Sequence, residues 1–481
     1  MGAIAATATR TLQGFEPQNI SNVVWSFATA GIPAPDLFRA VAATLVEDSR
    51  RNTPRWRRMT AQVMANIVWA YATANNDPGP ELFEVLGAAA MGCLGTFDPQ
   101  NLANFAWAYA TVERASPQLF GALAQASLHR LDDFVAEGLS STAWAYAKAG
   151  IQAPALFEAI AECAQAKIAG FNNQAMANIA WAFSTAEVIA PTLFDQIAIW
   201  SISRLDEMNP QDLSNLCYAF SSAHRAAPRL FDGIAEAAVR RGLLSEFNPQ
   251  DLSNTAFAYA TVGHSSPELF AAIADAARHQ LGRFTAQGFA NTLWSYCVLG
   301  TEAPALFDAA ADVLPDLLET LAGDTGFSAM MYQLFLFLQI EAPHPRLLMA
   351  LAEYRDVWLG AFANAEVNAS ESQRDVSHAL TALGWAHEVE YRTEDGLSLD
   401  MAQPSTKIAV EFDGPHHFNW GPEGPIFDGR TAFKRRLLAK LGWRVISVSH
   451  FDWDGRDGWT REAHLREHVL AATSMGLAPQ N

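Results

Sequence analysis

The chain has 481 residues, half of them apolar and 17% charged, with a formal net charge of −19 at pH 7. Such a length exceeds one compact core, so we expect several domains or one elongated array of repeats. The longest apolar run, residues 330–340, is too short to cross a bilayer, so no membrane contact is expected. The acidity argues against indiscriminate binding of phosphate, because nucleic-acid surfaces are usually basic.

The first fifteen residues are rich in Ala and Thr, include Arg10 and contain no acid before Glu16. This composition is typical of an organelle-targeting peptide, although a frayed start of a repeat would look the same. The four cysteines have no metal-binding spacing, and we interpret them as reduced core thiols.

A motif of the form Gln-x-x-x-Asn-x-x-Trp-Ala-Tyr-Ala-Thr recurs with a period of about 37 residues, which is typical of stacked helix pairs. A Pro-x-Leu-Phe segment follows each copy, and proline is well tolerated in the first turn of a helix. We therefore predict an α-solenoid over residues 1–363, with a degraded ninth unit at residues 327–348. The aromatic centres of the eight motifs are Trp25, Trp69, Trp107, Trp144, Trp181, Tyr218, Phe257 and Trp294.

Recurring aromatic residues at this spacing are usually core, so we predict that the centres are buried. In seven of the eight repeats an Asn stands three residues before the centre and a Gln seven before it, and both share its helical face. We expect these amides to point inward and to bond to the neighbouring repeat.

The position six residues before the centre varies among the repeats. RNA-binding arrays that read one base per repeat place variable side chains on a uniform scaffold. The polar members of this column are therefore candidate base-reading residues, although a solvated position would vary in the same way. They are Asn19, Asn101, Asp212 and Asp251.

The longest interval between motifs contains five arginines around Trp56. Arginines beside an aromatic ring suit phosphate contact and base stacking, so this insertion is a candidate RNA contact. A solvated loop is the alternative interpretation. The arginines are Arg50, Arg51, Arg55, Arg57 and Arg58.

After an expected linker at residues 364–372, the pattern changes to that of a small α/β domain over residues 373–481. The sequence predicts a helix at 374–383, strands at 387–391, 397–401 and 407–412, a Gly/Pro-rich loop, a helix at 430–441 and a strand at 443–448. This order, α-β-β-β-α-β, is that of the PD-(D/E)XK nuclease superfamily.

The segments Glu411-Phe-Asp-Gly-Pro-His416, Lys434-Arg-Arg-Leu-Leu, Gly442-Trp-Arg-Val-Ile and Asp452-Trp resemble the RAP domain. The helical units resemble the heptatricopeptide arrays of RAP proteins and, more distantly, the FAST-kinase-like mitochondrial proteins. The resemblance implies an organellar RNA-binding protein that acts in rRNA or mRNA processing, RNA stability or ribosome assembly. Its expected location is the mitochondrial matrix, with the plastid as the alternative. Its expected partners are single-stranded or structured RNA, with ribosomal proteins as further candidates.

A nuclease of this fold needs two acids to hold a divalent cation and a lysine to activate water. Asp400 and Glu411 are the matching candidate ligands for Mg²⁺. Asp413 stands where the lysine is usual, which leaves Lys434 as a displaced catalytic lysine and His416 as a proton carrier.

The alternative is a non-catalytic domain without a cofactor. In it Glu411 and Asp413 maintain a turn, while His416, Lys434, Arg435 and Arg436 bind the RNA backbone. We favour this alternative, since kinship of fold does not carry activity. A third hypothesis is an acidic scaffold that binds proteins.

Overall fold

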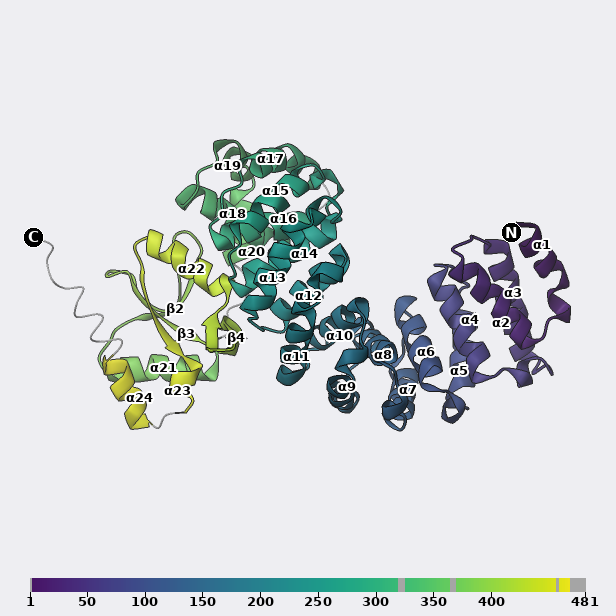
Figure 1. The fold of residues 1–481 in the computed structure, drawn as a ribbon. Coiled ribbons are helices and arrows are strands. Elements are labelled where there is room, and N and C mark those ends of the chain that lie inside the picture. The colour runs from purple at the N-terminus through teal and green to yellow at the C-terminus, as the bar shows by residue number, and fades with distance from the viewer. Residues whose placement is uncertain (1, 319–324, 364–368, 456–457, 468–481) are drawn as a thin grey trace, which may run out of the picture. The chain divides into compact units, whose positions relative to one another are not determined.

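Figure 1 shows the computed structural model, which describes residues 2–318, 325–363, 369–455 and 458–467. The chain divides into two compact units, residues 1–208 and 209–481. Residues 364–368 of the expected linker and residues 468–481 of the expected C-terminal domain lie outside the described ranges. No helix in the described ranges is both long and apolar enough to span a membrane.

The first unit begins with α1 (Gly2–Thr11) and continues as five helix pairs. The pairs are α2 (Pro17–Thr29) and α3 (Pro35–Arg50), α4 (Ala61–Thr73) and α5 (Pro80–Met91), α6 (Pro99–Thr111) and α7 (Pro117–Leu128), α8 (Ala136–Ala149) and α9 (Pro154–Ala166), and α10 (Asn173–Thr185) and α11 (Pro191–Ile202).

The second unit continues the repeat and then carries the C-terminal domain. Its helix pairs are α12 (Pro210–Ser222) and α13 (Pro228–Arg240), α14 (Pro249–Val262) and α15 (Pro267–Arg278), α16 (Ala286–Leu299) and α17 (Pro304–Leu318), and α18 (Thr325–Ile340) and α19 (Pro345–Ala352), followed by α20 (Arg355–Ala363). The predicted α-solenoid with a small α/β domain behind it is therefore confirmed.

The repeats stack through the tyrosine two residues after the aromatic centre. In five repeats this buried side chain donates a hydrogen bond of 2.5–2.7 Å to a main-chain oxygen in the second helix of the preceding repeat. The bond satisfies a buried hydroxyl and fixes the register between neighbouring repeats. The donors are Tyr71, Tyr109, Tyr146, Tyr259 and Tyr296, and the acceptors are Phe38, Phe83, Phe120, Phe231 and Phe270.

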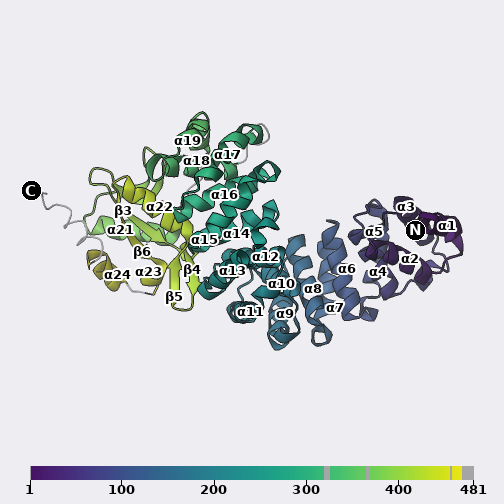
Figure 2. The same cartoon turned by 45° about the horizontal axis from the view of Figure 1, so that its top comes forward.

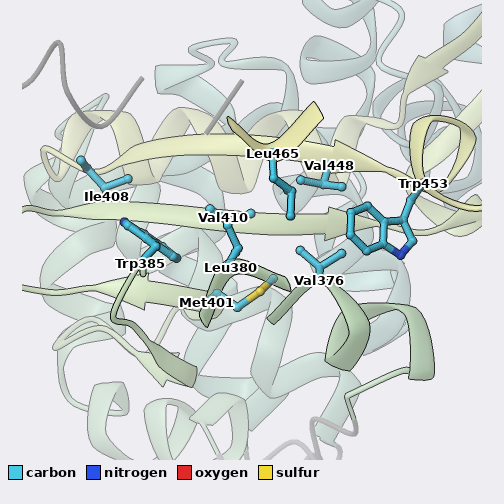
Figure 3. Packing of buried hydrophobic residues seen from close by; sticks show 9 residues of the cluster. All are labelled: Val376, Leu380, Trp385, Met401, Ile408, Val410, Val448, Trp453 and Leu465. Atoms are coloured by element: carbon cyan, nitrogen blue, oxygen red, sulfur yellow. The ribbon is translucent and has the colours of Figure 1, made fainter. Parts of the chain in front are cut away.

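The C-terminal domain is built on a four-stranded sheet in the order β1 (Glu388–Arg392), β2 (Ser398–Gln403), β3 (Ile408–Asp413) and β6 (Arg444–Ser449). The first three strands are antiparallel, and β6 runs parallel to β3. One sheet face forms an apolar core with α21 (Glu371–Ala382) and α24 (Gly458–Leu465), as Figure 3 shows. The core residues are Val376, Leu380, Trp385, Met401, Ile408, Val410, Val448, Trp453 and Leu465.

The other sheet face carries the polar side chains of β3, because successive residues of a strand point to opposite faces. Helix α22 (Gly429–Lys440) contributes the cations that meet them. The segment expected to be a Gly/Pro-rich loop instead contains the two-stranded hairpin of β4 (Phe418–Gly421) and β5 (Gly424–Phe427).

Within the second unit, the C-terminal domain lies directly against the repeats (Figure 2). Helix α22 contacts α14, α16 and α18. The hairpin bonds to the turn between α12 and α13, where Trp420 N–H donates to the His224 oxygen at 2.7 Å and Ala226 N–H donates to the Trp420 oxygen at 2.9 Å. A Cβ atom on Gly429 would overlap the main-chain oxygen of Ala260, so only glycine permits this close approach.

Candidate nucleic-acid interface

Each repeat is a pair of helices, and we call the one that carries the motif the first helix. The aromatic centres of the repeats form a ladder of rings along these first helices. In the first unit, consecutive rings have centroids 6.1–6.5 Å apart and interplanar angles of 32–35°. In the second unit, the rings of Tyr218 and Phe257 are 6.5 Å apart, and those of Phe257 and Trp294 are 5.5 Å apart. We call these side chains the aromatic ladder; in the first unit they are Trp25, Trp69, Trp107, Trp144 and Trp181.

The prediction that the ladder is buried is wrong for most of its members. Trp25 is 43% exposed, and all later rings except Trp294 are partly exposed. The core contains instead the aromatic residue two positions further on, such as Tyr71 and Tyr146. Two residues correspond to about 200° around a helix, so one of the two aromatic positions faces the core and the other faces outward.

The recurring amides lie beside the ladder and face outward as well. The Gln side chains are exposed and the Asn side chains are exposed or partly exposed. Gln18 donates to Asn22 at 2.9 Å and Gln287 donates to Asn291 at 2.7 Å, and both bonds lie within one helix. The Gln18–Asn22 pair therefore stays within its helix, whereas Gln287 also bonds to the neighbouring repeat, where Met330 Sδ of α18 accepts at 3.8 Å. An outward amide beside an aromatic ring can bond to the polar edges of a base that stacks on the ring.

The first helices carry almost no charge, although the chain is strongly acidic. Their only charged residues are Glu137, Lys148, Asp212 and Asp251. Asp212 and Asp251 are buried at helix starts. The ladder therefore lies on a neutral surface that does not repel an RNA strand as the acidic remainder of the array would.

The column of candidate base-reading residues has a different structural role. Each member is the third residue of a first helix, and its N–H bonds to the capping side chain in six of the eight repeats, as Asn101 N–H does to Asp98 at 2.7 Å. Asn19, Asp212 and Asp251 also accept from the N–H of the capping residue, which completes a reciprocal cap. Asn101, Asp212 and Asp251 are at most 7% exposed. Capping thus accounts for these polar residues, and burial keeps three of the four from a base.

The arginine insertion is occupied mostly by ion pairs within the chain. Arg55 is nearly buried, pairs with Asp48 at 2.5 Å and donates to three main-chain oxygens at residues 12–15. This arginine connects the segment between α1 and α2 to the insertion. Arg50, Arg51 and Arg58 pair with Glu81, Glu47 and Glu16 at 3.0, 2.5 and 3.0 Å. Arg50, Arg51 and Arg58 are still more than half exposed, and exposed ion pairs are weak, so these arginines and Arg57 stay candidate RNA contacts while Arg55 does not.

The acids on β2 and β3 meet as the sequence predicted, and the lysine of α22 joins them. Glu411 accepts from the Asp400 N–H at 3.2 Å, and Asp400 accepts from the Phe412 N–H at 2.8 Å. Lys434 Nζ lies 2.5 Å from Glu411 Oε2. Burial, and then the charge of Glu411, raise the pKa of Asp400 to about 7. Burial likewise raises the pKa of Glu390 on β1.

This arrangement does not fit a divalent cation. Lys434 Nζ binds the Glu411 oxygen that a metal would need. In the part of the chain that is described, no three His, Cys, Asp or Glu side chains are placed to hold a metal ion. The centre is an ion pair beside a neutral carboxylic acid, which suits a structural role.

Of the remaining candidate residues of the C-terminal domain, Asp413, Arg435 and Arg436 make contacts within the chain, and His416 lies on the surface. Asp413, 1% exposed, pairs with Arg435 at 2.5 Å and accepts from Ser447. Arg436 pairs with Glu341 at 2.9 Å and donates to the Val298 and Cys297 oxygens, so this partly exposed arginine connects α22 to the repeats. His416 is exposed.

Comparisons with known proteins match both the helical repeats and the C-terminal domain to protein families. Residues 410–468 match the RAP domain family, and residues 164–319 match the family of the RNA-editing substrate-binding complex 6 protein. A chloroplastic RAP domain-containing protein of Oryza sativa subsp. japonica is 36% identical over 101 residues. That match covers 21% of this chain and 15% of the rice protein.

Proposed function

We propose that this RAP-domain protein, with its array of helical repeats, binds single-stranded RNA along the aromatic ladder in an organelle. The observation that carries the proposal is the outward position of the ladder on a neutral, amide-lined surface. Every base has a π-face, so a row of partly exposed rings can stack bases whatever their sequence.

The comparisons support the cellular context of the proposal. The rice protein is named as chloroplastic, and the family that matches residues 164–319 is named for RNA editing. We therefore place this chain in rRNA or mRNA processing or stability in a mitochondrion or a plastid. The RAP domain acts there without catalysis, since its acids and lysine neutralise one another.

The proposal is tested by the affinity of the purified protein for a single-stranded RNA. We expect Trp107→Leu and Trp144→Leu each to weaken binding at least about fivefold, because a base–aromatic stack contributes about 1–3 kcal/mol. Trp144→Phe should retain most of the affinity, since it keeps an aromatic face. The measurement is a titration of labelled RNA at fixed salt.

Trp200→Leu is the matched control. Trp200 lies on the second helix α11, away from the ladder. Its loss also removes a packed indole, so it controls for a general loss of stability. Equal affinity for wild type, Trp107→Leu and Trp144→Leu would remove the ladder from the RNA surface. No RNA binding by the wild type would favour the acidic protein-binding scaffold instead.

A further inference from the structure

Helix α22 of the RAP domain reaches the last rings of the aromatic ladder. The guanidinium carbon of Arg430 lies 5.6 Å from the Phe257 ring centre and 5.7 Å from the Trp294 ring centre. Both distances are within the range of a cation–π contact. Trp294 is only 3% exposed, in contrast to the 43% of Trp25. Trp294, the last ring of the ladder, is therefore buried, and its Nε1 donates to Gln333 of α18 at 2.6 Å, whereas Phe257 stays partly exposed.

Arg430 differs from the other cations near it. Helix α22 carries five cations and no acid. Three of them are neutralised, since Lys434, Arg435 and Arg436 pair with acids. Arg430 is exposed and makes no ion pair with a described residue. Its ring contacts leave the N–H groups at the edge of the guanidinium free to donate.

Two histidines lie close to this arginine. The His224 and His416 rings have centroids 6.1 Å apart, one from the array and one from the RAP domain. His224 Nδ1 is buried without a hydrogen-bond partner. Burial lowers the pKa of His224, and the charges of His416 and Arg430 lower it further, while that of Asp428 raises it. His224 of the array therefore lies close enough to His416 and Arg430 of the RAP domain to interact with their charges.

We infer that Arg430 binds a backbone phosphate of the RNA at the point where the aromatic ladder ends. The inference rests on the proposed function, because the ladder must first hold the strand. Phe257 and Trp294 hold the guanidinium in place, and planar guanidinium groups match phosphate oxygens in bidentate geometry. The neutral ladder stacks bases, and Arg430 supplies a cation that its surface lacks. The array and the RAP domain then bind one strand together.

The test is the salt dependence of RNA affinity in the full chain. Each phosphate contact to a single strand contributes about 0.7 to the slope of log affinity against log salt. We expect Arg430→Gln to reduce the slope by about this amount and to weaken binding at low salt. Arg430→Lys should keep the slope, because it keeps the charge.

Lys440→Gln is the matched control, because Lys440 is an exposed cation at the other end of the same helix. It should leave the slope unchanged. A slope for Arg430→Gln equal to that of wild type, with ladder variants still weakened, would overturn the phosphate site while the proposed function stands. Equal slope losses for Arg430→Gln and Lys440→Gln would also overturn it, since they would indicate a diffuse charge effect. If the ladder variants and Arg430→Gln all bind RNA as the wild type does, both proposals are wrong.

Discussion

The array and the RAP domain differ most in how they distribute charge. The first helices present rings and amides with almost no charge, whereas α22 and the strands beneath it hold a dense set of buried ion pairs. Neutral rings can accept bases of any sequence, but they cannot attract a phosphate. The ion pairs of α22 neutralise three of its five cations, so these three leave little net charge for a ligand. Where the two regions meet, Arg430 contacts the last two rings of the ladder and makes no ion pair with a described residue.

We expect the largest difference between the two regions in how the stability of the RAP domain depends on pH. Asp400 has a pKa of about 7 in the folded chain and ionises near pH 4 when unfolded. Between these values only the unfolded chain has lost the proton, so stability decreases as pH rises and then levels off above pH 7. The slope from this group is at most about 1.4 kcal/mol per pH unit.

Asp400→Asn should therefore flatten the pH dependence of unfolding and raise stability at pH 8, measured by urea denaturation. The control is Glu423→Gln, which changes an exposed acid of the same domain. A wild-type curve without the decline between pH 4 and 7 would contradict the buried neutral acid. The same variant tests the nuclease hypothesis: we expect no RNA cleavage by wild type with Mg²⁺ or Mn²⁺, and cleavage that Asp400→Asn abolished would reinstate it.

A smaller effect is expected from separating the RAP domain from the repeats. Gly429→Ala places a methyl group against the Ala260 main chain and should destabilise the contact by about 1–3 kcal/mol. Hydrogen exchange should accelerate in α22 and at the end of α14, while the first unit stays protected. Gly282→Ala is the control, because a Cβ atom there meets nothing within 4 Å. Unchanged exchange in α22 would show that the RAP domain does not depend on this close approach.

The fold could be predicted from the sequence because local signals agreed with one another. The recurring motif set the repeat, and a proline marked the start of each second helix. The match of residues 397–412 to two adjacent strands of the nuclease fold predicted that Asp400 and Glu411 would meet. The β4–β5 hairpin escaped prediction because the turn around His224, about 190 residues earlier in the sequence, pairs with it.

The interface was harder to predict than the fold. Helical periodicity shows which residues share a face, but it does not show which face another helix covers. The constant Gln and Asn therefore suggested inward amides. A useful signal was available in the near absence of charge from the first helices, since a solvated helix face normally carries charges. Nothing local to Arg436 indicated that it would bond to the Cys297 and Val298 oxygens.

Photo-crosslinking can show whether RNA lies along the first helices of the repeats. RNA that contains 4-thiouridine would be crosslinked to the full chain, and the modified peptides would be identified by mass spectrometry. We predict crosslinks in α4, α6, α8 and α10 at the ladder residues, and at the start of α22 near Arg430. Crosslinks confined to the second helices, such as α7 and α9, would show that RNA does not lie along the ladder.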